Sequence, residues 1–288
     1  MNTDKLGFMA SLGFAVMAPE EALRILSKIG YKAVGWTLAH LDPREQSVEE
    51  IKQISGLTRR YNMEISEVVV QQNLVVLDND VRKNTIDFVL QCIQTFSEIG
   101  VKNINLFTGP CPWAPDTPKI GEDITEGRAW DMIYEAFDIF VPQAENFKMN
   151  LAVEGVWGML CHDYYSTRDL IEHYDSSYLG VTFDPSHDVL AGNLDVGWIV
   201  KKWGKRIKHV HLKDAVGIQE LGKFIFPLLG EGNVEWKSFF TALEDIGYDG
   251  YMTVEFESFK YYEQILHGDI RKAAVISLDN IKKLIGEK

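Results

Sequence analysis

The sequence predicts one α/β domain folded as a single (β/α)8 barrel. Two observations lead to this fold class: eight strand-like segments alternate with helical segments, and no linker or shift in composition divides the chain. Such alternation is typical of parallel sheets with right-handed helical crossovers. The length of 288 residues matches one such barrel, so we expect residues 1–288 to form one domain. A doubly wound open sheet is the alternative, but no Gly-x-Gly-x-x-Gly motif follows any predicted strand.

The predicted strands are short runs in which apolar residues alternate with polar ones. The clearest run is Ile-Lys-His-Val-His-Leu-Lys-Asp at 207–214. Its two histidines and Lys213 share one face, and its apolar side chains share the other. The eight predicted strands are 6–12, 33–37, 65–70, 102–108, 151–154, 179–184, 207–214 and 251–257.

The predicted helices lie between these strands. Pro19-Glu20-Glu21 is typical of a helix start, and Ser47-Val48-Glu49-Glu50 matches a capping box. The prolines between residues 109 and 127 favour a long loop after the fourth strand. The predicted helices are 19–29, one from about 47, 79–99, 128–148, 166–174, 196–203, 236–246 and most of the chain after 257.

Composition and charge narrow the classes of function. The net charge of −13 disfavours nucleic acid or an anionic membrane as the partner, so a small molecule is expected. Cys92, Cys111 and Cys161 have neither zinc-type spacing nor the even count of a disulfide framework. The N-terminus lacks a signal-peptide pattern, and no apolar stretch reaches the roughly 20 residues that span a bilayer. We therefore expect a cytoplasmic protein.

Four successive strands bring an ionisable side chain to one face near their carboxyl ends. These side chains are Glu154, Asp184, His211 and Glu255. Function in such barrels lies at that mouth, and carboxylates this close cannot all ionise without a cation between them. Each acid alone is more simply a solvated strand end, but the four residues together predict one divalent metal ion. Oxygen donors with one imidazole suit Mn2+ first, with Mg2+, Co2+ or Zn2+ as alternatives.

A metal held by these strands would leave positions open for two neighbouring substrate oxygens. It would polarise a carbonyl while a nearby carboxylate removes the α-proton. His209 lies one pleat deeper than His211 and is interpreted as a core histidine. Glu257 is expected above the plane of the metal, in the loop or in contact with solvent.

Several motifs resemble the xylose isomerase-like barrel superfamily in its sugar phosphate isomerase/epimerase branch. That branch includes ketose 3-epimerases, hydroxypyruvate isomerases and inosose dehydratases. The motifs cover the C-terminal half, whereas the N-terminal half agrees only in its alternation of elements. They are Ala152-Val153-Glu154, Phe183-Asp184-Pro185-Ser186-His187, His209-Val210-His211-Leu212-Lys213-Asp214, Gly230-Glu231-Gly232-Asn233-Val234-Glu235-Trp236, and Gly247-Tyr248-Asp249-Gly250 running into Val254-Glu255.

The resemblance implies that the four residues above are the metal ligands, with Glu154 and Glu255 also acting as acid and base on opposite faces of the substrate. It further implies that His187 binds a substrate oxygen. Leu160 and Gly217 stand where ketose 3-epimerases have a substrate-binding Glu and Arg. The form of the seventh strand resembles more closely the inosose dehydratases and the generic isomerase members, in which the residue matching Lys213 is placed to meet substrate oxygens.

Aromatic residues of the predicted mouth loops are further candidates for substrate contacts. Phe107, Trp113 and Trp157 are expected either to stack on a sugar ring and exclude water or to pack a loop onto the barrel. His162 is a candidate for touching the substrate or for supporting a residue that does.

The resulting prediction is a metal-dependent sugar isomerase or epimerase that moves a proton next to a carbonyl of a ketose or keto-sugar. The first alternative is a lyase on the same scaffold, either an inosose-type dehydratase or an enzyme that cleaves a 3-keto-glycoside or C-glycoside. A non-catalytic sugar-binding barrel is an alternative of another class. In each case the partner is a small carbohydrate, and association into a homo-oligomer is compatible with the resemblance.

Overall fold

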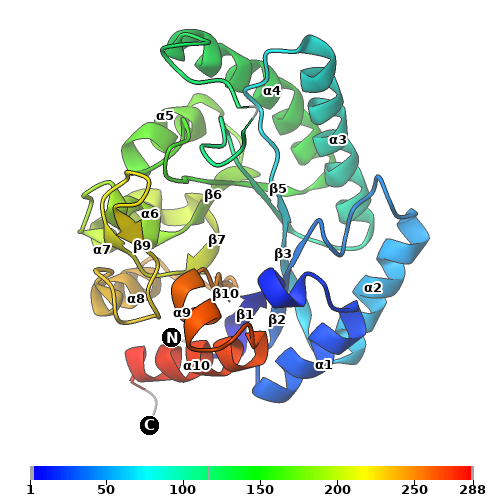
Figure 1. The fold of residues 1–288 in the computed structure, drawn as a ribbon. Helices are drawn as coiled ribbons and strands as arrows, with labels where there is room; N and C mark the ends of the chain where they lie inside the picture. Colours follow the sequence, from blue (N-terminus) through cyan, green and yellow to red (C-terminus); the bar gives the residue numbers. More distant parts are fainter. Residues whose placement is uncertain (1–2, 116, 287–288) are drawn as a thin grey trace.

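Eight parallel strands close into a barrel surrounded by helices in the computed structural model of the chain, which describes residues 3–115 and 117–286 (Figure 1). The order around the barrel is β1-β10-β7-β6-β5-β4-β3-β2, and neighbouring strands are parallel. The predicted (β/α)8 fold is therefore confirmed. The barrel strands are β1 (Leu6–Met9), β2 (Ala33–Thr37), β3 (Glu64–Val70), β4 (Asn103–Leu106), β5 (Asn150–Glu154), β6 (Leu179–Phe183), β7 (Ile207–Leu212) and β10 (Met252–Val254).

Most helices begin where the sequence signals predict. Helix α1 has Pro19 in its first turn and ends before Gly30 at φ 121°, and the capping box between Ser47 and Glu50 opens α2. The α-helices are α1 (Pro19–Ile29), α2 (Val48–Arg60), α3 (Asn79–Glu98), α4 (Glu126–Phe147), α5 (Tyr164–His173), α6 (Pro185–Leu190), α7 (Val196–Trp203), α8 (Trp236–Asp245), α9 (Phe259–Gln264) and α10 (Ile270–Leu284). Short 3-10 helices cover Thr3–Lys5, Leu12–Phe14 and Gly204–Arg206.

Some element bounds differ from the prediction. The first strand ends at Met9 rather than Leu12, and Leu12 instead begins a short 3-10 helix with a φ of 48°. The last strand ends at Val254, so Glu255 and Glu257 lie just beyond it. Helix α6 was not predicted, and the segment between β7 and α8 contains an antiparallel hairpin of β8 (Val216–Gly217) and β9 (Phe224–Ile225).

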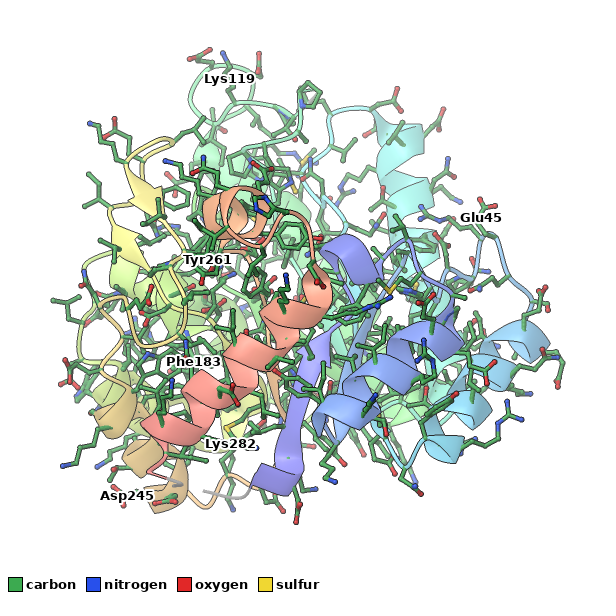
Figure 2. The ribbon with its side chains drawn as sticks, turned by 60° about the horizontal axis from the view of Figure 1, so that its bottom comes forward. Glu45, Lys119, Phe183, Asp245, Tyr261 and Lys282 are labelled. Carbon is green, nitrogen blue, oxygen red and sulfur yellow. The ribbon has the colours of Figure 1, made fainter. Side chains whose placement is uncertain are left out.

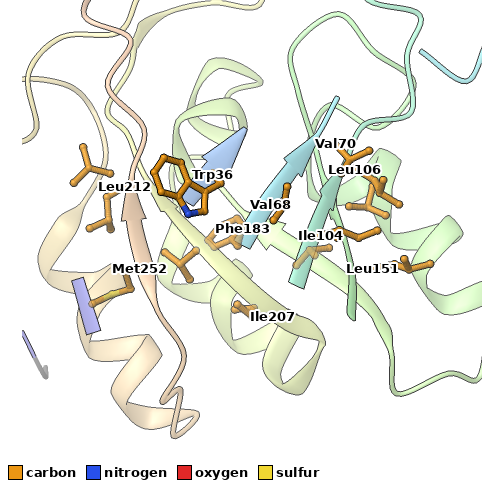
Figure 3. Close-up of a cluster of buried hydrophobic side chains, with 14 of the residues drawn as sticks. Trp36, Val68, Val70, Ile104, Leu106, Leu151, Phe183, Ile207, Leu212 and Met252 are labelled. Carbon is orange, nitrogen blue, oxygen red and sulfur yellow. The ribbon is translucent and has the colours of Figure 1, made fainter. Parts of the chain in front are cut away.

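The main core lies between the barrel and the helices. Strand side chains such as Val68, Ile104 and Phe183 are buried in it (Figure 3). The inside of the barrel is polar instead. Hydrogen bonds join strands that are not neighbours, as between Ser66 of β3 and Thr253 of β10, so these side chains cross the barrel interior. This division leaves the interior free to hold ionisable groups.

The pairing of β2 with β3 is irregular at the point where a charged side chain enters the barrel. Val34 pairs with Ile65 and Gly35 pairs with Glu67, so Ser66 is skipped. A bulge of this kind re-aims side chains. A Cβ on Gly35 would lie 3.0 Å from Glu67 Oε1, so glycine leaves room for that carboxylate.

The two ends of the barrel are built differently. In Figure 2, Tyr261 of α9 and Lys119 of the long loop lie toward one end, and Asp245 and Lys282 lie toward the other. The first end is the one at which the strands finish, and it carries the site described below. Among the described residues, no helix has the length and apolar character needed to cross a membrane.

Candidate metal centre at the barrel mouth

The structure brings Glu154, Asp184, His211 and Glu255 together. Glu154 ends β5, Asp184 follows β6, His211 lies in β7 and Glu255 follows β10. One ligand atom from each lies within 4.8 Å of the others, and all four side chains are buried. Their convergence follows from the parallel strands, whose carboxyl ends meet at one mouth. Their role as metal ligands stays a prediction.

The ring of His211 has a defined orientation. Its Nδ1 lies 3.1 Å from Glu154 Oε1 and 3.5 Å from Glu255 Oε2, so this nitrogen faces the carboxylates. Its Nε2 lies 2.8 Å from Oε1 of Glu67, which also lies 3.1 Å from His209 Nε2. Burial raises the pKa of Glu67, but the two histidines outweigh it and lower this pKa to about 2. Glu67 is thus a buried anion that the sequence analysis did not predict.

His209 lies deeper in the barrel and is fully buried. Its Nε2 is 2.9 Å from Thr253 Oγ1 in addition to its contact with Glu67. These contacts agree with the interpretation of His209 as a core histidine. The same Glu67 carboxylate therefore links both histidines of β7.

Lys213 places its ammonium among three carboxylates. Its Nζ contacts Glu255 Oε2 and lies 3.0 Å from both Asp184 Oδ2 and Glu257 Oε2. Burial disfavours the charged amine, but the surrounding carboxylates raise the pKa of Lys213 above its ordinary value. Burial also raises the pKa of Glu257, to about 7, and Lys213 only partly offsets this. One ammonium therefore serves several acids.

Asp184 supplies the clearest test of whether a cation fits. Its Oδ1 accepts a hydrogen bond from Ser186 N, but Oδ2 accepts none of adequate geometry even though Lys213 Nζ lies 3.0 Å away. Burial, with the nearby Glu255 and Glu154 charges, raises the pKa of Asp184 to about 6. A buried carboxylate oxygen without a hydrogen bond, in a cluster whose ligand atoms lie within 4.8 Å of one another, fits a divalent cation as a further partner.

Asn105 and His187 lie beside two of the candidate metal ligands, Glu154 and Asp184. Asn105 of β4 donates from Nδ2 to Glu154 Oε2 at 2.9 Å, which leaves Oε1 turned toward His211. The backbone N–H of Trp157 donates to His187 Nδ1 at 3.3 Å. His187 Nε2 consequently carries the proton and lies 3.7 Å from Asp184 Oδ2. Burial lowers the pKa of His187 well below its ordinary value, so its ring is neutral.

A cavity of about 810 Å3 opens above these groups. The predicted contact residues Phe107, Trp113, Trp157, His187 and Lys213 all line it. Their contacts with a substrate stay predictions, but their placement agrees with them.

His162 was expected either to touch the substrate or to support a residue that does, and its role stays a prediction. It is not among the residues that line the cavity within the described parts of the chain. Its Nδ1 instead lies 2.9 Å from Met159 O and 3.1 Å from Leu160 O. The imidazole ring of His162 therefore contacts backbone carbonyl groups of its own loop and stabilises the loop that carries Trp157.

The cavity also has walls that were not predicted. Phe224, Ile225 and Phe226 of the β8–β9 hairpin form one wall, and Phe259 and Tyr261 of α9 form another. The run Phe224-Ile225-Phe226 is the signal in the sequence for an apolar wall in this segment.

A closed parallel barrel with buried carboxylates and an imidazole at its mouth defines an enzyme-type (β/α)8 barrel with a candidate metal centre. The chain belongs to the xylose isomerase-like TIM barrel family, whose sequence profile matches residues 23–284. The resemblance identified from the C-terminal motifs is thereby confirmed. This membership places the protein in an enzyme superfamily.

Individual relatives and structures agree with this assignment. An inosose dehydratase of Clostridium perfringens is 26% identical over 150 residues, or 48% of this chain and 50% of that protein. D-psicose 3-epimerase of Clostridium cellulolyticum H10, solved with D-tagatose, superposes with a TM-score of 0.77 at 18% identity, over 98% of this chain and 99% of that one. The IolI protein, solved with a zinc atom, gives 0.75 at 17% identity over 98% of both chains. These two structures show a shared fold.

Proposed function

We propose that the protein is a divalent-metal-dependent sugar isomerase or epimerase that moves a proton at the carbon next to a carbonyl. The observation that carries this proposal is the convergence of Glu154, Asp184, His211 and Glu255 within 4.8 Å. These residues would hold the ion, His211 through Nδ1. When bound, the ion would polarise a substrate carbonyl and stabilise the negative charge that develops on it.

Glu255 and Glu154 are proposed to accept and return the proton. Burial opposes ionisation of Glu255, but Lys213 and His211 lower its pKa below the ordinary value, so the group is in the ionised form that a general base requires. Glu154 is oriented by Asn105 and serves the opposite face of the substrate. Two carboxylates on opposite faces allow a proton to leave one face and return on the other, which inverts the carbon.

His187 and Lys213 are proposed to bind substrate oxygens. The neutral His187 ring offers its Nε2 proton, and Lys213 offers the protons of a buried ammonium. Both line the cavity beside Glu154 and Glu255. Such donors hold hydroxyl or carbonyl oxygens in place and exclude water from the reacting carbon.

The metal, partner and compartment are part of the same proposal. Three carboxylates and one imidazole suit Mn2+ first, with Mg2+, Co2+ or Zn2+ as alternatives. We propose a small carbohydrate as the substrate, one domain over residues 1–288, no nucleic-acid or membrane partner, a cytoplasmic location and possible association into a homo-oligomer.

A lyase is the second candidate. It is favoured by the curated relatives named inosose dehydratase, one of which matches about half of the chain. A dehydratase also begins with removal of an α-proton, so the same two carboxylates would serve. The two activities differ in whether a group leaves the neighbouring carbon.

Proton exchange tests the proposal directly. The Mn2+-loaded protein is incubated in deuterated water with ketoses, inososes and 3-keto-glycosides, and NMR identifies the labelled carbon and the product. Glu255→Gln is expected to fold and bind sugar but lose exchange by a factor of about 100 or more. Glu98→Gln, at an exposed position of α3, is the matched control. Full exchange in Glu255→Gln, or sugar binding without exchange in the unsubstituted protein, would contradict the proposal.

A further inference from the structure

The cavity above the candidate metal centre is larger and more apolar than the proposed chemistry needs. Its volume of about 810 Å3 lies toward the upper end of pockets for drug-sized ligands, which span about 300–1,000 Å3. The groups that would bind sugar oxygens, including His187 and Lys213, are buried at one end. A free monosaccharide held there would leave the outer part of the cavity unfilled.

One wall of this outer part is a continuous series of aromatic rings. The centroids of Trp113 and Trp157 are 5.8 Å apart, those of Trp157 and Phe224 are 4.9 Å apart, and those of Phe224 and Phe226 are 5.3 Å apart. The last ring lies 4.7 Å from Lys213 Nζ. The series therefore runs from the rim of the cavity to the ammonium beside the carboxylates.

Two of the aromatic side chains that line the cavity are partly exposed to solvent at its rim. Trp113 is 53% exposed on one lip, and Phe259 at the start of α9 is 46% exposed on the other. Exposed apolar surface next to a cavity marks a binding site. An aromatic ring stacks on such side chains at centroid distances of about 4.5–7 Å.

The hairpin that carries Phe224 of this wall is tied to the site. Gln219 donates from Nε2 to His162 O at 3.0 Å and to His187 O at 3.1 Å. The wall is therefore held in place by the loop and helix that position His187. A preorganised apolar wall loses little entropy when a ligand covers it.

We propose that the outer cavity is a subsite for a flat apolar substituent of the substrate, such as an aromatic aglycone. The inference rests on the proposed function, because it places the keto-sugar against Glu154 and Glu255 and the attached ring between Trp113 and Phe259. The substrate class is then a keto-sugar that carries an aromatic group rather than a free sugar.

Binding measurements with matched probes test this subsite. Methyl and phenyl 3-keto-β-D-glucosides are titrated into the protein by calorimetry, with Mn2+ and again with chelator. The phenyl probe is expected to bind about tenfold tighter or more. Trp113→Ala and Phe259→Ala are each expected to remove most of this advantage, and Trp113→Phe is expected to keep it.

Trp198→Ala is the control, since Trp198 is 41% exposed on α7 and lies outside the cavity lining. Equal affinity for the two probes overturns the inference, and so does a phenyl advantage that neither alanine substitution reduces. A phenyl advantage that is lost in both variants supports it, even where no probe exchanges deuterium. A phenyl advantage without deuterium exchange would count against the proposed function but not against the subsite. Failure of the subsite and failure of the proposed function can therefore be distinguished.

Discussion

Oε1 of Glu67 lies 2.8 Å from Nε2 of His211, on the side of the ring opposite to Glu154. This contact leaves Nδ1 as the nitrogen that faces the cluster of carboxylates. A carboxylate that holds the second nitrogen of a metal-binding histidine fixes the tautomer and the ring orientation. We therefore infer that Glu67 positions His211.

Glu67→Gln tests this role. The substitution keeps the shape of the side chain and removes its charge, so the affinity for Mn2+ is expected to fall about 10- to 100-fold. Calorimetry measures the affinity. Glu64→Gln, at an exposed position of the same strand, is expected to leave it unchanged. An unaltered affinity in Glu67→Gln would show that the contact only packs the barrel.

Lys213→Met tests whether the Lys213 ammonium compensates the buried carboxylates in the metal-free protein. Because Lys213 contacts Asp184, Glu255 and Glu257, its loss leaves buried carboxylates uncompensated. The free energy of unfolding of the metal-free protein is expected to fall by about 3–5 kcal/mol. Added Mn2+ is expected to restore more stability in the variant than in the unsubstituted protein, because the ion replaces the missing charge.

Urea unfolding with chelator and with Mn2+ measures both quantities. The control is Lys201→Met, which removes an exposed ion pair with Asp245 and is expected to cost about 1 kcal/mol or less. If Lys213→Met lowered the free energy of unfolding by the same amount with and without Mn2+, the ammonium and the ion would not share these carboxylates.

The residues predicted to converge could be found from sequence because strand ends follow simple patterns. Alternation in β7 places His211 on the inner face, and parallel strands bring Glu154, Asp184 and Glu255 to the same level. The bounds of β2 and α7 also match the prediction. Local signals thus suffice for the elements and for the side chains at their ends.

Glu67 and the hairpin could not be found in this way. Glu67 meets His211 only because the barrel closes and sets β3 across from β7. The bulge at Ser66 also breaks the alternation that would indicate its direction. Strands β8 and β9 have two residues each, too few for a periodic pattern. For Glu67, the available signal in the sequence was an acid directly before the apolar run Val68-Val69-Val70.

Asp188 predicts a pH dependence of stability. Its Oδ1 accepts hydrogen bonds from Tyr164 N and Asn193 Nδ2. Burial is the main cause that raises its pKa from 3.8 to about 7, and the nearby Asp163 and Asp184 add to this effect. The folded protein therefore holds a proton that the unfolded chain releases between about pH 4 and pH 7. Stability from this group is present below that window and is lost as the pH rises through it.

Asp188→Asn removes this dependence and can keep both hydrogen bonds. The variant is expected to gain stability relative to the unsubstituted protein as the pH rises from 5 to 7, by up to about 1.4 kcal/mol per pH unit. Urea unfolding at saturating Mn2+ measures the difference while the ligands stay deprotonated. Asp175→Asn, at an exposed position, is the control. Parallel pH profiles for Asp188→Asn and the unsubstituted protein would contradict the prediction.

Asp214 anchors the segment 228–236, part of which lines the cavity. Its carboxylate accepts hydrogen bonds from the backbone N–H groups of Gly230, Gly232 and Val234, and from Trp236 Nε1, at 2.9–3.1 Å. A Cβ at residue 232 would lie only 2.1 Å from Asp214 Oδ1. Gly232→Ala must therefore displace the carboxylate and weaken several bonds at once.

Gly232→Ala is expected to lower the free energy of unfolding by about 3 kcal/mol, because hydrogen bonds to a charged group contribute about 1.5–3 kcal/mol each. Hydrogen exchange in the segment 228–236 is expected to rise with it. Gly56→Ala is the matched control, since a Cβ there meets nothing within 4 Å and alanine in helix α2 should stabilise by about 1 kcal/mol. If Gly232→Ala were as stable as the unsubstituted protein, the close contact with Asp214 would not constrain the segment, and Leu228 and Glu231 would line the cavity without this anchor.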